Sequence, residues 1–162
     1  MKLFFILLLF SFSGSAQKTH IERPKVNLIV GDSTVQKSIE IPICVTPDTL
    51  VIAPTYKAHV LGFHIVEFIV DDEKGEKTYF ATYDFNWDKI HCYLITDNSD
   101  FIQEKYFFYS AIEIKVESIY YYNQLDPYGM PMPLEVSQRT MKSIEITHSG
   151  HFRLIKTEQL NR

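Results

Sequence analysis

The sequence predicts a mainly β protein, an antiparallel, sandwich-like domain with one short α-helix near residues 100–109. Several stretches of strand length alternate apolar and polar residues with period two, and turn-forming residues separate them. One stretch, His59–Val70, is apolar on both alternating faces, which is typical of a strand covered on both sides. An α+β fold is the alternative if the helix is longer.

Three short strands are expected first. Val26–Val30 is apolar and β-branched, and Gly31 ends it. Ser38–Val45 places isoleucine and valine on one face and mainly polar residues on the other. Pro42 lacks an N–H, which favours an edge position or a bulge. Thr49–Ala53 is a further strand between two prolines.

The middle of the chain predicts a β-hairpin. His59–Val70 is the expected central strand, and residues 71–76 form a polar turn in which Gly75 can adopt positive φ. Lys77–Phe85 returns as its partner, and Ile90–Thr96 is the next expected strand.

A helix is expected after this strand. Asp100 and Gln103 have the spacing of a capping box, which favours a helix from Phe101 to about Tyr109. The alternative is that the aromatic run at residues 106–109 begins the next strand.

The last third predicts three more strands. Ile112–Tyr122 alternates until Ser118, where the apolar phase slips by one residue, and such a slip indicates a β-bulge. Residues 123–133 form a loop with a type I turn at Asp126–Gly129. Two strands joined by a tight turn complete the domain: residues 139–147 and 152–156.

The N-terminus predicts export. Lys2 precedes the apolar run 3–10, and the residues that follow up to Ala16 are small and polar apart from Phe12, so residues 1–16 are predicted to be a signal peptide. The run is far shorter than the roughly 20 apolar residues of a spanning helix, which argues against an uncleaved anchor. Residues 17–25 are an expected flexible segment, and 26–157 a single β-rich domain. The expected location is periplasmic or extracellular, with no transmembrane segment after cleavage.

Charge and cysteine content limit the partners. The 162 residues carry a net charge of −4, which argues against nucleic acid and against anionic lipid. Cys44 and Cys92 can form a disulfide in an oxidising compartment, or stay as two buried thiols, and only geometry decides between these. No CxxC and no Cys/His cluster occurs, so no metal or other cofactor is expected.

Aromatic and methionine residues are the candidate binding residues. Such side chains are enriched in interfaces, although they are equally common in cores. The end of the strand and the following loop contain Tyr120, Tyr121, Tyr122, Tyr128, Met130 and Met132. Trp87 is the only tryptophan, and it is the best candidate for stacking on a sugar ring.

Candidates for catalysis are few. No GxSxG motif occurs. Glu67 lies within the most apolar strand, where a buried carboxylate can act as an acid, or where it faces solvent or pairs with Lys or Arg. His148 and His151 fit a turn better than a metal site, since a catalytic zinc needs three protein ligands. No catalytic residue is therefore predicted, and no enzymatic activity is expected.

Part of the chain resembles a known family. Ile112–Ile119 alternates toward the turn Leu125–Gly129, and Ile144–Ile146 closes the motif. With these elements, residues 60–147 resemble the C-terminal β-domain of the gliding-motility shaft protein family of Bacteroidetes, which is associated with type IX secretion. Ser110-Ala111 stands where that family has a glycine. The resemblance implies a shared fold and an exported setting, but not motor coupling.

The expected function is that of an exported, non-enzymatic interaction domain that binds another protein. An accessory role in a secretion or cell-surface system fits the resemblance. The alternatives are a carbohydrate-binding or adhesin-type module, with a glycan as partner, and an unrecognised small hydrolase.

Overall fold

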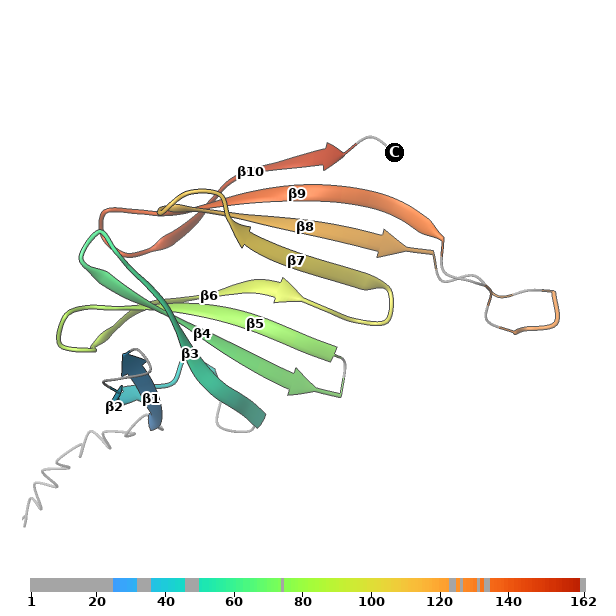
Figure 1. Ribbon diagram of the computed structural model, residues 1–162. Helices are drawn as coiled ribbons and strands as arrows, with labels where there is room; N and C mark the ends of the chain where they lie inside the picture. Colours follow the sequence, from blue (N-terminus) through green and yellow to red (C-terminus); the bar gives the residue numbers. More distant parts are fainter. Residues whose placement is uncertain are drawn as a thin grey trace, which may run out of the picture.

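Figure 1 shows the chain as a computed structural model. The structure describes residues 25–31, 36–45, 50–73, 75–122, 125, 127–130, 132 and 135–160. The predicted signal peptide 1–16 and residues 17–24 lie outside this part of the chain, whereas Lys25 already belongs to the first strand.

The described residues form ten β-strands and no helix. The strands are β1 (Lys25–Gly31), β2 (Gln36–Pro42), β3 (Leu50–Val60), β4 (Phe63–Asp72), β5 (Gly75–Tyr83), β6 (Lys89–Asp97), β7 (Ile102–Phe108), β8 (Glu113–Tyr121), β9 (Val136–Ile146) and β10 (Phe152–Leu160).

All strand pairs are antiparallel and, within each sheet, join strands that are consecutive in sequence, so each four-stranded sheet is a meander. β1 and β2 form a two-stranded sheet, and two four-stranded sheets follow with the orders β3-β4-β5-β6 and β10-β9-β8-β7. Figure 1 shows the β3–β6 sheet between the small β1–β2 sheet and the β7–β10 sheet. The predicted mainly β, antiparallel fold is confirmed.

Strand β4 is central because both of its faces are buried. Ile65 points into one apolar cluster, while Val66 and Phe68 point into another, and all three are fully buried. Alternate residues of a strand face opposite sides, so the β3–β6 sheet has a core on each side. Each such large apolar side chain stabilises the fold by about 1.5–3 kcal/mol relative to exposure. This confirms the predicted strand covered on both sides.

The first core lies between the two four-stranded sheets. Phe80 of β5 is fully buried, and its ring centroid lies 5.0 Å from that of Tyr106 and 5.7 Å from that of Phe108, both on β7. Phe152 of β10 approaches the same ring at 6.4 Å. The remaining buried members are Ile65, Ile95, Ile114, Val116, Ile144 and Ile146.

The second core lies under the β1–β2 sheet. Leu28 of β1 and Ile41 of β2 are fully buried and join the cluster of Val66 and Phe68. The hydroxyl of Tyr83 donates a 2.6 Å hydrogen bond to the carbonyl of Pro42, which satisfies a polar group that this packing buries. The β1–β2 sheet thus covers the outer face of the β3–β6 sheet.

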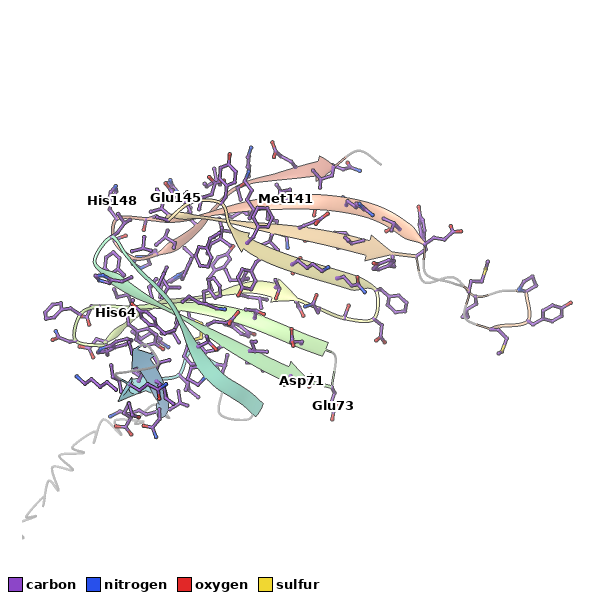
Figure 2. The ribbon with its side chains drawn as sticks, viewed as in Figure 1. His64, Asp71, Glu73, Met141, Glu145 and His148 are labelled. Atoms are coloured by element: carbon purple, nitrogen blue, oxygen red, sulfur yellow. A yellow bond between two sulfur atoms is a disulfide. The ribbon has the colours of Figure 1, made fainter. Side chains whose placement is uncertain are left out.

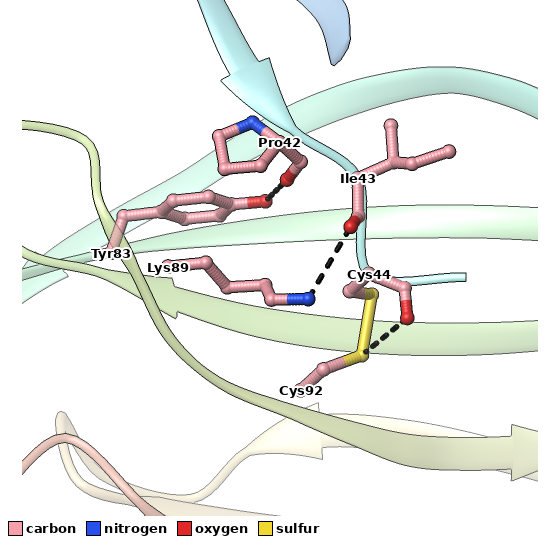
Figure 3. The surroundings of a disulfide bond; sticks show 6 residues. All are labelled: Pro42, Ile43, Cys44, Tyr83, Lys89 and Cys92. Atoms are coloured by element: carbon pink, nitrogen blue, oxygen red, sulfur yellow. Dashed lines mark hydrogen bonds between the residues drawn. A yellow bond between two sulfur atoms is a disulfide. The ribbon is translucent and has the colours of Figure 1, made fainter. Parts of the chain in front are cut away.

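A disulfide fastens this small sheet to the larger one. Cys44, just after β2, is bonded to Cys92 of β6, with their Cα atoms 5.7 Å apart (Figure 3). Lys89 Nζ donates to the carbonyl of Ile43 at 3.4 Å beside the bond. The disulfide alternative is therefore the one that the fold adopts. Because disulfides persist mainly in oxidising compartments, this bond indicates an extracytoplasmic environment. In the part of the chain described, no helix is long and apolar enough to cross a membrane.

One predicted strand is in fact two. His59–Val70 contains a turn, since β3 ends at Val60 and β4 begins at Phe63. Leu61 and Gly62 both have positive φ, 53° and 85°, as in a two-residue hairpin turn. The usual signal for this turn is Asn-Gly or Asp-Gly, and an apolar Leu-Gly pair does not stand out in an apolar run.

The predicted helix at residues 100–109 is wrong, because this segment contains β7, which pairs with β8. Its residues Ile102, Tyr106 and Phe108 do alternate, but Glu104 occupies the fourth position on the same face and is buried. Because the described residues contain no helix, the α+β alternative is wrong as well. The predicted bulge exists, although the register shifts between Tyr120 and Tyr121 rather than after Ser118.

The disulfide should carry much of the stability of the β1–β2 layer. Its 48-residue separation implies a loss of about 4 kcal/mol in the free energy of unfolding when both cysteines are replaced by alanine. Trp87, which packs against the same cluster, provides the fluorescence signal for urea unfolding. Equal midpoints for the wild-type chain and the C44A/C92A variant would contradict this role.

Candidate functional site

The three consecutive tyrosines lie on both sides of their sheet. Tyr120 faces the β3–β6 sheet and lines a cavity of about 270 Å³ with Glu104 and Lys142. Tyr121 faces the other way, and its hydroxyl donates to Gln103 Oε1 at 2.9 Å. Tyr122 follows the end of β8 and is 43% exposed. The three rings therefore do not share one flat binding surface.

The connection between β8 and β9 exposes a group of apolar side chains. Its described residues Leu125, Tyr128, Met130 and Met132 are 60%, 90%, 63% and 41% exposed. Figure 1 shows this connection extending away from both four-stranded sheets. Gly129 has a φ of +80°, a conformation that glycine adopts without strain. We call these four exposed residues the β8–β9 tip.

Trp87 lies in an aromatic cluster at the opposite end of the sheets. Its ring stacks on His64 with centroids 4.1 Å apart and planes 5° apart, and it also approaches Tyr56 and Tyr83. One ring face is thus covered. The adjacent Phe85 is 77% exposed.

The turn that carries Phe85 is rigidly built. Asp84 Oδ1 accepts hydrogen bonds from the backbone N–H groups of Asn86 and Asp88 at 2.8 and 2.9 Å. Trp87 has a φ of 67°, which is uncommon for a bulky residue, and its N–H donates to the Asp84 carbonyl at 3.0 Å.

Glu67 takes part in a polar network between the two sheets. Its carboxylate lies 2.7 Å from Lys57 Nζ and accepts a hydrogen bond from the Tyr106 hydroxyl. Burial lowers the pKa of Lys57, but hydrogen bonds to Glu67 and Tyr106 outweigh it, so the net shift is upward. Burial, and then the bond to Glu67, raise the pKa of Tyr106. The network therefore contains a charged lysine and a neutral tyrosine donor, which suits a structural ion pair.

A second buried carboxylate, Glu104, was not a predicted site residue. It accepts hydrogen bonds from the Ser118 hydroxyl at 2.6 Å, from Lys142 Nζ at 2.8 Å and from the Asp97 N–H at 2.7 Å. Both oxygens of this carboxylate therefore accept hydrogen bonds, which offsets the cost of burying it. The sequence signal was weak, because a glutamate on an expected helix needs no buried partner.

The acidic turn and the adjacent β6–β7 turn form an open groove of about 640 Å³. Glu73, Glu76, Asp100 and Phe101 are among its lining residues. The Asn98 N–H donates to the Glu76 carbonyl at 2.9 Å and holds the two turns together. Figure 2 shows Asp71 and Glu73 at the end opposite His64 and His148. No three His, Cys, Asp or Glu side chains among the described residues could together hold a metal ion.

Four histidines form two close pairs at the other end. His59 and His64 have ring centroids 4.8 Å apart, and His91 and His151 have centroids 5.0 Å apart. Burial, and then His59, lower the pKa of His64, although Asp84 opposes this. His148, which is exposed, belongs to neither ring pair.

His91 supports the β9–β10 turn. Its Nδ1 accepts the backbone N–H of Phe152 at 3.2 Å, which requires an unprotonated nitrogen. Burial, and then the nearby His151, lower the pKa of His91. The Thr82 hydroxyl donates to the Gly150 carbonyl at 2.5 Å in the same turn.

Comparison with known proteins adds no family, since no protein-family model, no curated protein and no solved structure matches the chain. The candidate site therefore depends on geometry alone. Tyr128, Met130 and Met132 are all exposed on the connection between β8 and β9. Trp87 instead stacks on His64, which Figure 2 shows at the opposite end of the sheets from Asp71 and Glu73.

The Tyr106 hydroxyl should stabilise the fold through Glu67. The Y106F variant leaves one carboxylate oxygen of a buried glutamate without its donor, so the free energy of unfolding should fall by about 2 kcal/mol. Phe107→Ala, an exposed neighbour on β7, is the control and should change stability little. A neutral effect of Y106F would show that the hydrogen bond does not contribute.

Stability should rise with pH through the range in which His91 loses its proton. The unfolded state, with a histidine pKa of about 6.5, binds protons more readily than the folded state, whose His91 pKa is lowered. This stability is fully present above pH 6.5 and is lost as the pH falls through the folded pKa.

Urea unfolding at a series of pH values tests this dependence. The H91N variant keeps an acceptor but does not titrate, so its pH slope should be smaller than that of the wild type. Identical slopes for H91N and the wild type would contradict the role of His91.

Proposed function

We propose that the chain is an exported, non-enzymatic interaction domain that binds another protein through the β8–β9 tip. This proposal rests mainly on the exposure of Tyr128, Met130 and Met132 on a connection that extends away from both sheets. Aromatic and methionine side chains are enriched in protein interfaces, and tyrosine is among the residues that most often contribute a large share of the binding energy.

The polar networks support a structural rather than a catalytic role for the buried carboxylates. Glu67 is paired with Lys57 and Tyr106, and Glu104 is paired with Lys142 and Ser118. In both cases the partners occupy the oxygens that a general acid or base would use.

The disulfide supports the exported setting of this proposal, since such bonds persist in oxidising compartments. An accessory role in a secretion or cell-surface system, which the resemblance of residues 60–147 implies, belongs to the same proposal. The partner is a protein of that compartment with an apolar surface that accepts the tip.

A carbohydrate-binding role is the second candidate, and Phe85 favours it. Its ring is 77% exposed, and Asn86 and Asp88 follow it in a turn whose backbone N–H groups are bonded to the Asp84 carboxylate. An aromatic face next to amide and carboxylate groups can stack on a sugar ring and bind its hydroxyls.

Photo-crosslinking in the native compartment tests the first proposal. A photoreactive residue at position 125 of the tagged chain should form one discrete adduct, and Y128A/M130A should reduce its yield at least about tenfold, because two exposed anchors are lost. Y109A removes a ring that is 63% exposed elsewhere and should leave the adduct unchanged.

Two outcomes oppose the protein-binding role. An adduct that is insensitive to Y128A/M130A would remove the tip from the interaction. Glycan binding that is lost in F85A but kept in Y128A/M130A would instead select the carbohydrate-binding role.

A further inference from the structure

Strand β10 is the least covered strand among those described. Seven consecutive side chains, from Arg153 to Gln159, are exposed, so both faces of the strand are open. The strand pairs only with β9. Figure 1 shows it at the outer margin of the β7–β10 sheet. An open edge of this length has unpaired backbone groups that another strand can bind.

The other edges of the two four-stranded sheets each have a neighbour. β1 packs beside β3, and β6 contacts both β7 and β10. β6 is also held by the disulfide at Cys92. β7 is joined to the preceding turn by a bridge between Ser99 and Ile102. β10 also contacts β6, at its first residue Phe152, whose N–H is bonded to His91 and whose ring lies near those of His91 and Tyr93. Among the described strands, the exposed residues 153–159 that follow are the stretch of edge that we consider for an added strand.

The charges of β10 are complementary to those of a second, antiparallel copy. Lys156 and Glu158 lie two residues apart on one face, and Lys156 Nζ is 2.9 Å from Glu158 Oε1. If Thr157 lies opposite Thr157 of the other chain, each Lys156 lies opposite a Glu158. The four charges then alternate in sign, which stabilises cross-strand pairing.

We propose that two copies of this chain associate through antiparallel pairing of their β10 strands about a two-fold axis at Thr157. The two β7–β10 sheets then form one continuous sheet across the dimer. This interface is independent of the β8–β9 tip, so it goes beyond the proposed function.

Two neighbouring registers would also keep equivalent faces of the two strands on the same side of the sheet. Repulsion between like charges disfavours both of them. A two-fold axis at Lys156 places two ammonium groups opposite each other, and an axis at Glu158 places two carboxylates opposite each other. A register shift between Leu154 and Lys156 places Ile155 outside the regular ladder with β9, so regular pairing about an axis at Thr157 is limited to about Lys156–Glu158. An interface this small gives a dissociation constant in the micromolar range or weaker.

Charge reversal provides the first test. Sedimentation velocity of the chain from Gln17 onward, from about 5 to 500 µM, should show a monomer–dimer equilibrium. K156E and E158K should each weaken association at least about tenfold, because each places two like-charged pairs across the interface. The double variant K156E/E158K restores opposite charges and should regain most of the affinity.

The controls separate this interface from general charge effects and from the tip. K37E reverses an exposed charge on β2 and should dimerise like the wild type. Y128A/M130A should also dimerise normally. A wild-type chain that is monomeric at 500 µM, or a double variant no better than the single ones, would overturn the proposal.

Engineered crosslinking tests the register itself. T157C places the new thiol opposite its own copy, and the two native cysteines are already paired, so oxidation should give a covalent dimer on non-reducing gels. Q159C moves the thiol away from the axis and should crosslink at least about tenfold more slowly. Equal rates for the two variants would contradict the Thr157 axis.

Discussion

Strand β4 places apolar side chains on both faces of the β3–β6 sheet, so this sheet needs a cover on each side. Ile65 is buried against the β7–β10 sheet, while Val66 and Phe68 are buried under the β1–β2 sheet. The two covers differ in strength. The first is a four-stranded sheet whose aromatic side chains contact Phe80 of β5. The second is a two-stranded sheet, which is marginally stable alone and is joined to β6 by the Cys44–Cys92 disulfide. The disulfide is thus a consequence of the apolar outer face.

Two buried carboxylates lie among the apolar side chains between the two four-stranded sheets. Glu67 and Glu104 lie on inward faces, and each is surrounded by donors from other strands. In both networks the donors offset the cost of burying a carboxylate away from water. The side chains that remain for contact with other molecules lie at the periphery: the β8–β9 tip, the turn that carries Phe85, and the β10 edge. These three surfaces are separate, so a domain of this size can contact a partner and a second copy at once.

The sequence was sufficient to predict the antiparallel β class, the doubly buried central strand and most of the strand positions, since period-two alternation follows directly from the pleat. Prediction from the sequence failed where contacts between distant parts of the chain, rather than local residue patterns, determine the structure. Leu61-Gly62 forms a turn without the usual polar residues. Ile102–Phe108 is a strand because Glu104 finds partners on β8 and β9, which no local pattern reveals. The exposed loop residues were identifiable by type, whereas the networks of Glu67 and Glu104 depend on strand register and could not be predicted.

Hydrogen exchange of the intact chain, followed by mass spectrometry, tests the two-sided burial of the central sheet most directly. Backbone amides of β4 and β5 are bonded within the sheet and covered on both faces, so they should exchange slowest and remain protected after those of β10 have exchanged. Exchange of β4 and β5 at the rate of β10 would show that the two apolar faces are not both covered, and it would contradict this account.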